Sequence, residues 1–131
     1  IDVFFPFIDG RKDFMHYRNS GLNNVLVDLL KQQNLALGID FSFLLSQDQN
    51  CIVKLGRIIQ NIKFGQKRNI NFCVTFLPAS IGQLRDALDV KSLLVCLGMT
   101  PGNANKALQF AYSRYVQNKK RKQITRGIIE L

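Results

Sequence analysis

Residues 52–68, IVKLGRIIQNIKFGQKR, and residues 70–76, INFCVTF, decide the fold of this chain. In the first stretch, apolar residues recur at the spacing of a helix that buries one side; these are Ile52, Leu55, Ile58, Ile59 and Ile62. The other side carries the cationic residues Lys54, Arg57, Lys63, Lys67 and Arg68. The second stretch is an apolar run with aromatic and β-branched residues, typical of a strand buried on both faces. Together they predict an α/β unit with a positive outer face.

The residues before this unit show the same alternation. Residues 1–8, IDVFFPFI, favour a strand, and residues 9–19 favour a polar loop. Ser20 is the predicted N-cap of a helix that ends near Asn34, with its apolar positions at Leu22, Val25, Leu26, Leu29 and Leu30. Residues 35–43, LALGIDFSF, predict a second strand. Alternating strands and helices indicate parallel strands joined by right-handed crossovers.

Two more helices are predicted after the third strand. Residues 78–83 form a loop at its carboxyl end, which is the edge where parallel α/β folds usually carry function. Asp89 is the predicted N-cap of a short helix ended by Gly98. The next helix has a predicted buried side made of Ala104, Ala107, Leu108, Ala111, Tyr112 and Tyr115. Residues 118–123 are a basic run, and residues 127–131 favour a final strand. We expect a single domain over residues 1–131.

Positive charge is concentrated in the later part of the chain. The 131 residues include 18 Lys and Arg against 9 Asp and Glu, a net charge of +9. Residues 49–129 hold 14 of the basic residues and only 2 acids, Asp86 and Asp89. A field of one sign favours a polyanionic partner. No apolar run approaches the ~18 residues of a membrane-spanning helix, and we expect no membrane partner.

The sequence carries few signs of catalytic or metal chemistry. Three cysteines, Cys51, Cys73 and Cys96, are widely spaced, which favours reduced, mostly buried thiols over a disulfide framework or a metal site. His16 is the only histidine, and we interpret it as a solvated loop residue because no partner for a general base is visible near it. Phosphate-binding and nucleophile-elbow motifs are absent. These features predict a binding subunit.

Four segments carry a resemblance to a known family. Residues 19–45, NSGLNNVLVDLLKQQNLALGIDFSFLL, match a helix and its following strand, and residues 57–76 match a basic helix and strand. Residues 78–98 match a Leu-Arg loop and a helix end that reads Leu-Gly-Met, and residues 125–131 match a terminal strand. In this order and spacing, the segments resemble archaeal ribonuclease P protein component 3.

The chain departs from that family's pattern at three places. Asn24 stands where the family has a histidine after Ser-Gly, the preceding loop carries extra residues near FMHYR, and no proline follows Arg85. Members of the family form a closed, TIM-barrel-like fold with further strands and helices before the point that matches residue 1. We therefore expect an α/β, partial TIM-barrel-like (β/α) fold with about four parallel strands and outer helices. Its upstream half is missing from this sequence or supplied by another chain.

The resemblance implies an RNA-binding protein subunit of ribonuclease P, the ribonucleoprotein whose catalytic RNA removes the 5′ leader from precursor tRNA. Such a subunit is accessory to an RNA-based endonuclease, with no catalytic or metal-ligating residue of its own. It binds no cofactor, and Mg²⁺ serves the RNA. The implied partners are the ribonuclease P RNA, protein component 2 and, indirectly, precursor tRNA, in the cytoplasm of an archaeon.

Phosphate contacts from Lys and Arg give affinity for structured RNA without much sequence readout. The predicted RNA-binding residues are Arg11, Lys12, Arg18, Asn24, Lys63, Lys67, Arg68, Arg85, Lys119, Lys120, Arg121 and Lys122. Asn24 would bond a phosphate or a 2′-hydroxyl at a helix start. For each lysine, an ordinary solvated face is the alternative.

Other interpretations stay open. Phe72, Phe76, Tyr112 and Tyr115 are candidates for a protein interface, with core packing as the alternative for each. The whole chain is alternatively another basic RNA-binding module, such as a ribosome-associated protein, or a fragment of a barrel hydrolase. Stimulation of leader cleavage by a cognate RNA separates the first interpretation from both of these.

Overall fold

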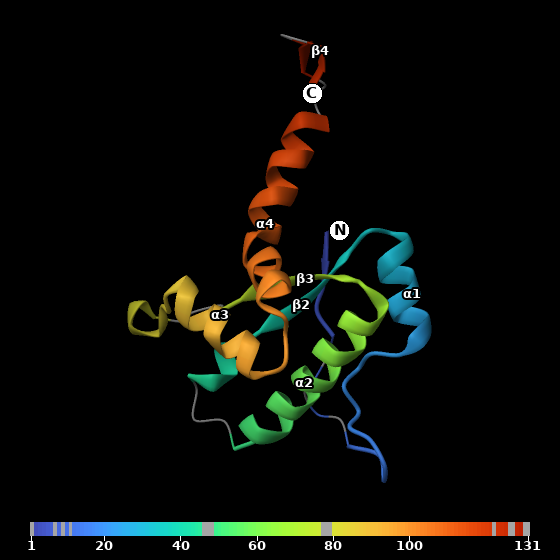
Figure 1. The fold of residues 1–131 in the computed structure, drawn as a ribbon, viewed down its shortest axis with the longest axis vertical. Coiled ribbons are helices and arrows are strands. Elements are labelled where there is room, and N and C mark those ends of the chain that lie inside the picture. The colour runs from blue at the N-terminus through green and yellow to red at the C-terminus, as the bar shows by residue number, and fades with distance from the viewer. Residues whose placement is uncertain are drawn as a thin grey trace.

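The structure is a computed structural model, shown in Figure 1. It describes residues 2–6, 8, 10, 12–45, 49–76, 80–121, 123–125 and 128–129. Of these, Arg121, residues 123–125 and residues 128–129 are described by their backbone alone. The chain forms a partial β/α fold with a parallel sheet and surrounding helices, as predicted.

The sheet has three parallel strands in the order β1-β2-β3. They are β1 (Val3–Phe4), β2 (Ala36–Asp40) and β3 (Asn71–Thr75). The register pairs Val3 with Ala36 and Ala36 with Asn71. Helices α1 (Asn24–Gln32) and α2 (Cys51–Arg68) are the two crossovers. Short 3-10 turns, η1 (Ser42–Leu44) and η2 (Ile81–Gln83), follow β2 and β3.

Helix α1 begins later than predicted. Asn23 is its N-cap, because the Asn23 side chain accepts a hydrogen bond of 2.8 Å from the Leu26 backbone N–H. The prediction of Ser20 as the cap was wrong; Ser20 is 3% exposed and lies against α2. Asn34 follows the helix with φ at 52°, a left-handed conformation that asparagine tolerates. The predicted end of the helix is therefore confirmed.

The position of α2 was predicted, but its faces are rotated. Ile52, expected on the apolar stripe, is 79% exposed, whereas Arg57, expected on the cationic face, is 4% exposed. The buried residues of the helix are Arg57, Ile58, Asn61, Ile62 and Gly65. Gly65 permits a close approach to β3, since an added Cβ would lie 2.5 Å from the Phe72 ring. The helix ends at Asn69, whose φ is 53°.

The next two helices, α3 (Ala87–Cys96) and α4 (Pro101–Arg121), pack against each other beside β3. Asp86 caps α3 instead of the predicted Asp89, and Gly98 follows it with φ at 96° as predicted. Along α4, the predicted buried side is correct for Ala104 and Ala107 and wrong for Tyr112 and Tyr115, which are 72% and 62% exposed. The later half of α4 extends beyond the sheet (Figure 1). These two tyrosines therefore have no core to enter.

One hydrophobic core joins the helices to one face of the sheet. Residues at alternate positions of a strand share a face, and Leu37, Ile39 and Phe72 enter the same buried cluster as α1 to α4. On the opposite face, Gly38 lies beneath the ring of Phe5, which would be 2.5 Å from an added Cβ. Cys73 is buried on that face, and its desolvation raises the pKa of the thiol.

The C-terminal residues form a separate hairpin. Strand β4 (Gln123–Thr125) pairs antiparallel with β5 (Ile128–Ile129) at the far end of α4 (Figure 1). The predicted strand at residues 127–131 is thus confirmed in part, but it does not join the parallel sheet. That sheet has three strands among the described residues, where about four were expected. The predicted basic run at residues 118–123 largely continues α4.

None of the described helices is both long enough and apolar enough to cross a membrane.

Candidate nucleic-acid interface

Helix α2 provides an extended cationic surface. Its sequence contains no Asp or Glu. Lys63 and Lys67 are exposed and lie one turn apart, with Gln60 on the same side of the helix. Among the described residues, neither lysine forms an ion pair with a carboxylate. Two like charges at this spacing repel each other by a few tenths of a kcal/mol, so an anion bound between them would relieve the repulsion.

The segment before α1 is fastened along this helix. Arg57 forms an ion pair of 2.7 Å with Asp13 and also donates to the carbonyl of Ile8. The Arg18 guanidinium donates to the Val53 carbonyl at 3.3 Å, and Gln60 donates to the carbonyl of Arg18 at 3.1 Å. These contacts hold residues 12–22 against α2 and form one wall of a groove.

Asp13 is the acceptor in this contact between the loop and α2. The Asn19 backbone N–H donates to its carboxylate at 2.9 Å, and the Arg57 side chain donates at 2.7 and 3.0 Å. The first of these bonds, followed by that from Arg57, lowers the pKa of Asp13 from its ordinary value, 3.8. Arg57, which the sequence placed on the outward cationic face, is therefore a buried anchor whose charge is matched within the fold.

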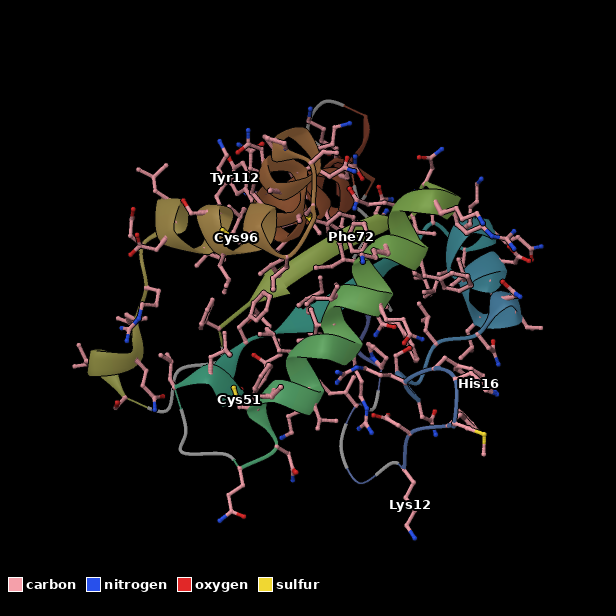
Figure 2. All side chains as sticks on the ribbon, turned by 60° about the horizontal axis from the view of Figure 1, so that its bottom comes forward. Lys12, His16, Cys51, Phe72, Cys96 and Tyr112 are labelled. Atoms are coloured by element: carbon pink, nitrogen blue, oxygen red, sulfur yellow. The ribbon has the colours of Figure 1, made fainter. Side chains whose placement is uncertain are left out.

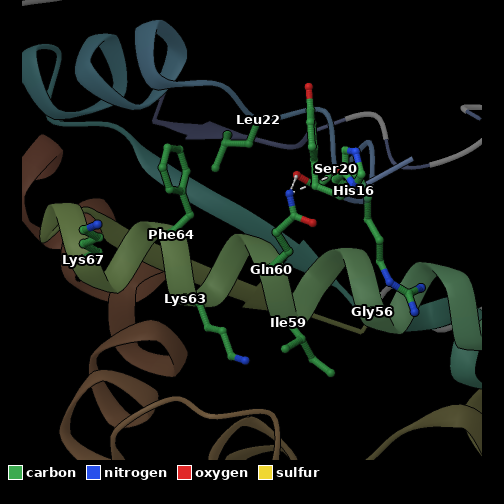
Figure 3. A pocket seen from close by; sticks show the side chains of 11 residues that line it. His16, Ser20, Leu22, Gly56, Ile59, Gln60, Lys63, Phe64 and Lys67 are labelled. Carbon is green, nitrogen blue, oxygen red and sulfur yellow. Dashed lines mark hydrogen bonds between the residues drawn. The ribbon is translucent and has the colours of Figure 1, made fainter. Parts of the chain in front are cut away.

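The groove between this segment and α2 has a volume of about 590 Å³ (Figure 3). Gln60 and Phe64 point from α2 toward Ser20 and Leu22, while the Lys63 side chain lies on the other side of the groove (Figure 3). The residues that line it are His16, Tyr17, Arg18, Ser20, Leu22, Gly56, Ile59, Gln60, Lys63, Phe64 and Lys67. Cations, aromatic rings and amide and hydroxyl groups thus meet in one place, and none of these lining residues is acidic.

Of the predicted RNA-binding residues, the structure brings Arg18, Lys63 and Lys67 to this groove. Beyond its end, Arg68 donates to Asn24 at 3.2 Å and pairs with Asp28 at 3.4 Å. Lys67 and Arg68 lie in the last turn of α2, where their positive charges interact favourably with the negative end of the helix dipole. This is a structural role that does not depend on RNA.

Other predicted residues lie elsewhere. Lys12 projects from the loop into solvent (Figure 2). Arg85 lies just after η2, the short turn that Figure 1 draws at the opposite edge of the view from α1. It donates to the Gly82 and Leu84 carbonyls. Lys119 and Lys120 are exposed at the far end of α4. Arg11, Lys122 and the side chain of Arg121 lie outside the described residues.

Several groove residues were missed by the sequence analysis. His16 was interpreted as a loop residue, and it does lie in the loop, but it also lines the groove. Tyr17, Gln60 and Phe64 were not singled out, and Ser20 was predicted only as a helix N-cap. The only available signal was an aromatic residue between two cationic or titratable ones, His16-Tyr17-Arg18, in a loop otherwise rich in polar residues.

No three His, Cys, Asp or Glu side chains gather as potential metal ligands in the part of the chain that the structure describes.

Comparison with solved structures finds a similar fold in a chain of the cryo-EM structure of archaeal ribonuclease P with mature tRNA. The likeness has a TM-score of 0.74 at 20% sequence identity and covers 100% of this chain. It covers 55% of the other chain, so the sequence here spans about half the length of that neighbour. At this identity the likeness shows a shared fold.

No family model matches the sequence, and no curated protein is matched either. The similarity to this structural neighbour therefore rests on the arrangement of the backbone.

Proposed function

We propose that this chain is part of an RNA-binding subunit of ribonuclease P, corresponding to protein component 3. The observation that carries the proposal is the fold shared, over the whole of this chain, with a chain from an archaeal ribonuclease P structure. The cationic groove supplies a chemical reason, because structured RNA is bound mainly through its backbone. The subunit neutralises and orders the catalytic RNA, and the RNA performs the cleavage of precursor tRNA.

Lys63 and Lys67 are the central phosphate contacts in this proposal. Both are exposed on a helix without acids, and both border the groove. Each phosphate neutralised by a lysine releases condensed counterions, which gives an affinity that falls steeply with salt. Arg18 adds a third charge from the opposite wall. Arg68 contributes less, because Asp28 and Asn24 already take its hydrogen bonds.

The remaining predicted residues extend the contact. Lys12 and the helix-start Asn24 are exposed at the two ends of residues 12–24, the stretch that also carries Arg18. Arg85, Lys119 and Lys120 lie on other elements of the fold, and they bind a second part of the RNA or serve solubility. Component 2 is the proposed protein partner. Mg²⁺ is required by the RNA and is not held by this protein.

A reconstituted cleavage assay tests the proposal. Precursor tRNA is incubated with the cognate ribonuclease P RNA and component 2 at moderate Mg²⁺, with and without this chain. We expect the chain to raise the cleavage rate or lower the Mg²⁺ requirement. The variant Lys63→Glu/Lys67→Glu removes the effect, whereas the matched variant Lys31→Glu/Lys106→Glu, with two exposed lysines elsewhere, keeps most of it.

The other outcomes point to other functions. Similar binding to many unrelated RNAs, without any effect on cleavage, identifies a general basic RNA-binding module and overturns the proposal. Turnover of a substrate in the absence of RNA identifies part of a hydrolase. Circular dichroism of each variant separates loss of folding from loss of binding, because both pairs of lysines are exposed.

A further inference from the structure

The groove beside α2 combines three kinds of group that a nucleotide requires. Leu22, Ile59 and Phe64 supply apolar surface, and all three pack partly against the core. Ser20 and Gln60 supply polar atoms at the back of the groove. Its volume of about 590 Å³ falls within the range of small-molecule sites, ~300–1,000 Å³. A duplex is too wide to enter such a space, but one base with its sugar can.

The aromatic ring of Tyr17 lines the groove and packs against the ring of Phe14. The centroids of the Tyr17 and Phe14 rings lie 4.7 Å apart with their planes tilted by 31°. The Phe14 backbone N–H donates to the Tyr17 carbonyl at 3.0 Å, which closes the turn between them. Tyr17 is still 61% exposed and lines the groove. Phe14 therefore supports one side of the Tyr17 ring and leaves surface on which a base can stack.

Polar atoms at the back of the groove can bond a base edge. The Gln60 amide nitrogen donates to the Arg18 carbonyl at 3.1 Å and to the Ser20 hydroxyl at 3.5 Å (Figure 3). These bonds fix the amide group, so the Gln60 carbonyl oxygen is directed elsewhere and can accept from a base. Ser20 is 3% exposed and its hydroxyl accepts from Gln60, so its own proton can be donated.

Charge at the rim selects an anionic ligand. Arg18, Lys63 and Lys67 border the groove, and its described lining includes no carboxylate. Asp13, whose charge acts on Arg18, already accepts hydrogen bonds from Asn19 and Arg57. An acidic peptide satisfies the cations but makes no use of the stacking ring or the two polar groups. A nucleotide uses the cations, the stacking ring and the polar groups.

We propose that this groove seats one unpaired nucleotide of the bound RNA, with its base against Tyr17 and its phosphate between Lys63 and Lys67. The inference rests on the proposed function and specifies what the chain recognises in its RNA. A bulged or looped-out nucleotide is preferred to a paired one, since only an unstacked base can enter. Base stacking on an aromatic side chain contributes enough for a difference of about fivefold or more in affinity.

Two hairpin RNAs of equal length and charge test the proposal with the full chain. One carries a single bulged 2-aminopurine in its stem, and the other carries the same base paired. Binding is measured by fluorescence anisotropy, and the position of the base by 2-aminopurine emission. We expect the bulged RNA to bind about fivefold or more tightly. Its emission is quenched in the complex, and the emission of the paired RNA is unchanged.

Variants assign the effect to the groove. Tyr17→Leu abolishes both the preference for the bulge and the quenching, whereas Tyr17→Phe keeps both. Tyr112→Leu is the matched control, because Tyr112 is 72% exposed on α4, away from the loop that carries His16 (Figure 2). Lys63→Ala lowers the affinity for both RNAs, since it removes a phosphate contact rather than a stacking surface.

Each other outcome overturns the inference. Equal affinity for the two RNAs, or a preference that persists in Tyr17→Leu, excludes the binding of an unpaired nucleotide in the groove. Either result leaves the proposed function intact. Failure to bind either RNA removes the proposed function together with the inference. Displacement of the bulged RNA by a hexaglutamate peptide at concentrations that leave the paired RNA bound assigns the groove to an acidic protein segment instead.

Discussion

Nη2 of Arg57 lies 2.7 Å from Oδ1 of Asp13, a residue 44 positions earlier in the chain. The arginine side chain is 5% exposed and the aspartate side chain 32% exposed. This pair connects the centre of α2 to the loop that forms the other wall of the groove. The loop is therefore positioned by one partly buried ion pair and by the hydrogen bonds around it, and the position of the groove depends on that pair.

Removing Arg57 should loosen this loop. Arg57→Ala loses the bonds to Asp13 and to the Ile8 carbonyl, and we expect the free energy of unfolding to fall by about 2 kcal/mol. Urea denaturation followed by circular dichroism measures the change. The control Arg85→Ala removes an exposed arginine with only local carbonyl contacts, and its effect should stay within about 0.5 kcal/mol. Equal losses for the two variants would contradict the anchoring role.

The same pair should make stability depend on acid pH. Hydrogen bonds from the Asn19 backbone and from Arg57 lower the pKa of Asp13 in the folded state below its ordinary value, 3.8. At low pH the unfolded chain therefore binds this proton first, so its contribution is full above about pH 4 and is lost as the pH falls further. Asp13→Asn should be less stable than the native chain at pH 7, with the difference shrinking as the pH falls below about 4. A constant difference would show that Asp13 does not titrate in this way.

Local pattern predicted the elements well but predicted long-range pairing poorly. The extents of α2 and β3 followed from apolar periodicity and from a short apolar run, both of which are properties of adjacent residues. The burial of Arg57 did not, because its partner lies 44 positions away and periodicity contains no information about distant partners. Tyr112 was wrongly assigned to the buried side of α4 because its helical spacing matches that of Ala104. The spacing contains no information about where the sheet ends, and Tyr112 lies beyond that end.

The candidate site was predicted in part on similar grounds. Lys63 and Lys67 could be identified because charge on a helix face is visible in sequence. The groove itself could not, since it depends on how residues 12–22 return along α2. Arg85 was grouped with them by charge and motif position alone, and it is not among the residues that line the groove.

Gly65 should be intolerant of a side chain. An added Cβ would lie 2.5 Å from Cζ and 2.9 Å from Cε1 of Phe72, whose ring is buried in the core. Gly65→Ala should therefore lower the free energy of unfolding by about 1–3 kcal/mol, despite the better helix propensity of alanine. Gly102→Ala is the matched control in α4, where an added Cβ meets nothing within 4 Å. It should be neutral or stabilising by up to about 1 kcal/mol. A stabilising Gly65→Ala would show that α2 and β3 are not in such close contact.

Lys63 and Lys67 should account for part of the salt dependence of RNA binding. If each contacts one phosphate, Lys63→Ala/Lys67→Ala should reduce the slope of log affinity against log salt by about 1.5, at ~0.7–0.9 per contact. Titrations at several salt concentrations measure the slope. Lys31→Ala/Lys106→Ala removes the same charge from α1 and α4 and should leave the slope nearly unchanged. An equal decrease in both variants would indicate a general effect of net charge rather than contacts at the groove.

Gly56 offers a test of the position of Arg18 that leaves every charge in place. An added Cβ at Gly56 would lie 2.4 Å from Cζ of the Arg18 guanidinium, which rests on α2 at that point. The guanidinium is the far end of a flexible side chain, so it can move away at little cost. Gly56→Ala should then be neutral or stabilising by up to about 1 kcal/mol. It should also break the hydrogen bond from Arg18 to the Val53 carbonyl.

RNA affinity should respond differently from stability. With the guanidinium displaced, a preorganised charge is lost from the wall of the groove, and we expect Gly56→Ala to weaken RNA binding about threefold. Arg18→Ala should weaken it by at least as much, and adding Gly56→Ala to that variant should have no further effect, because the two changes act on one side chain. Additive losses in the double variant would mean that Gly56 affects binding by another route and that Arg18 does not act from the position seen here.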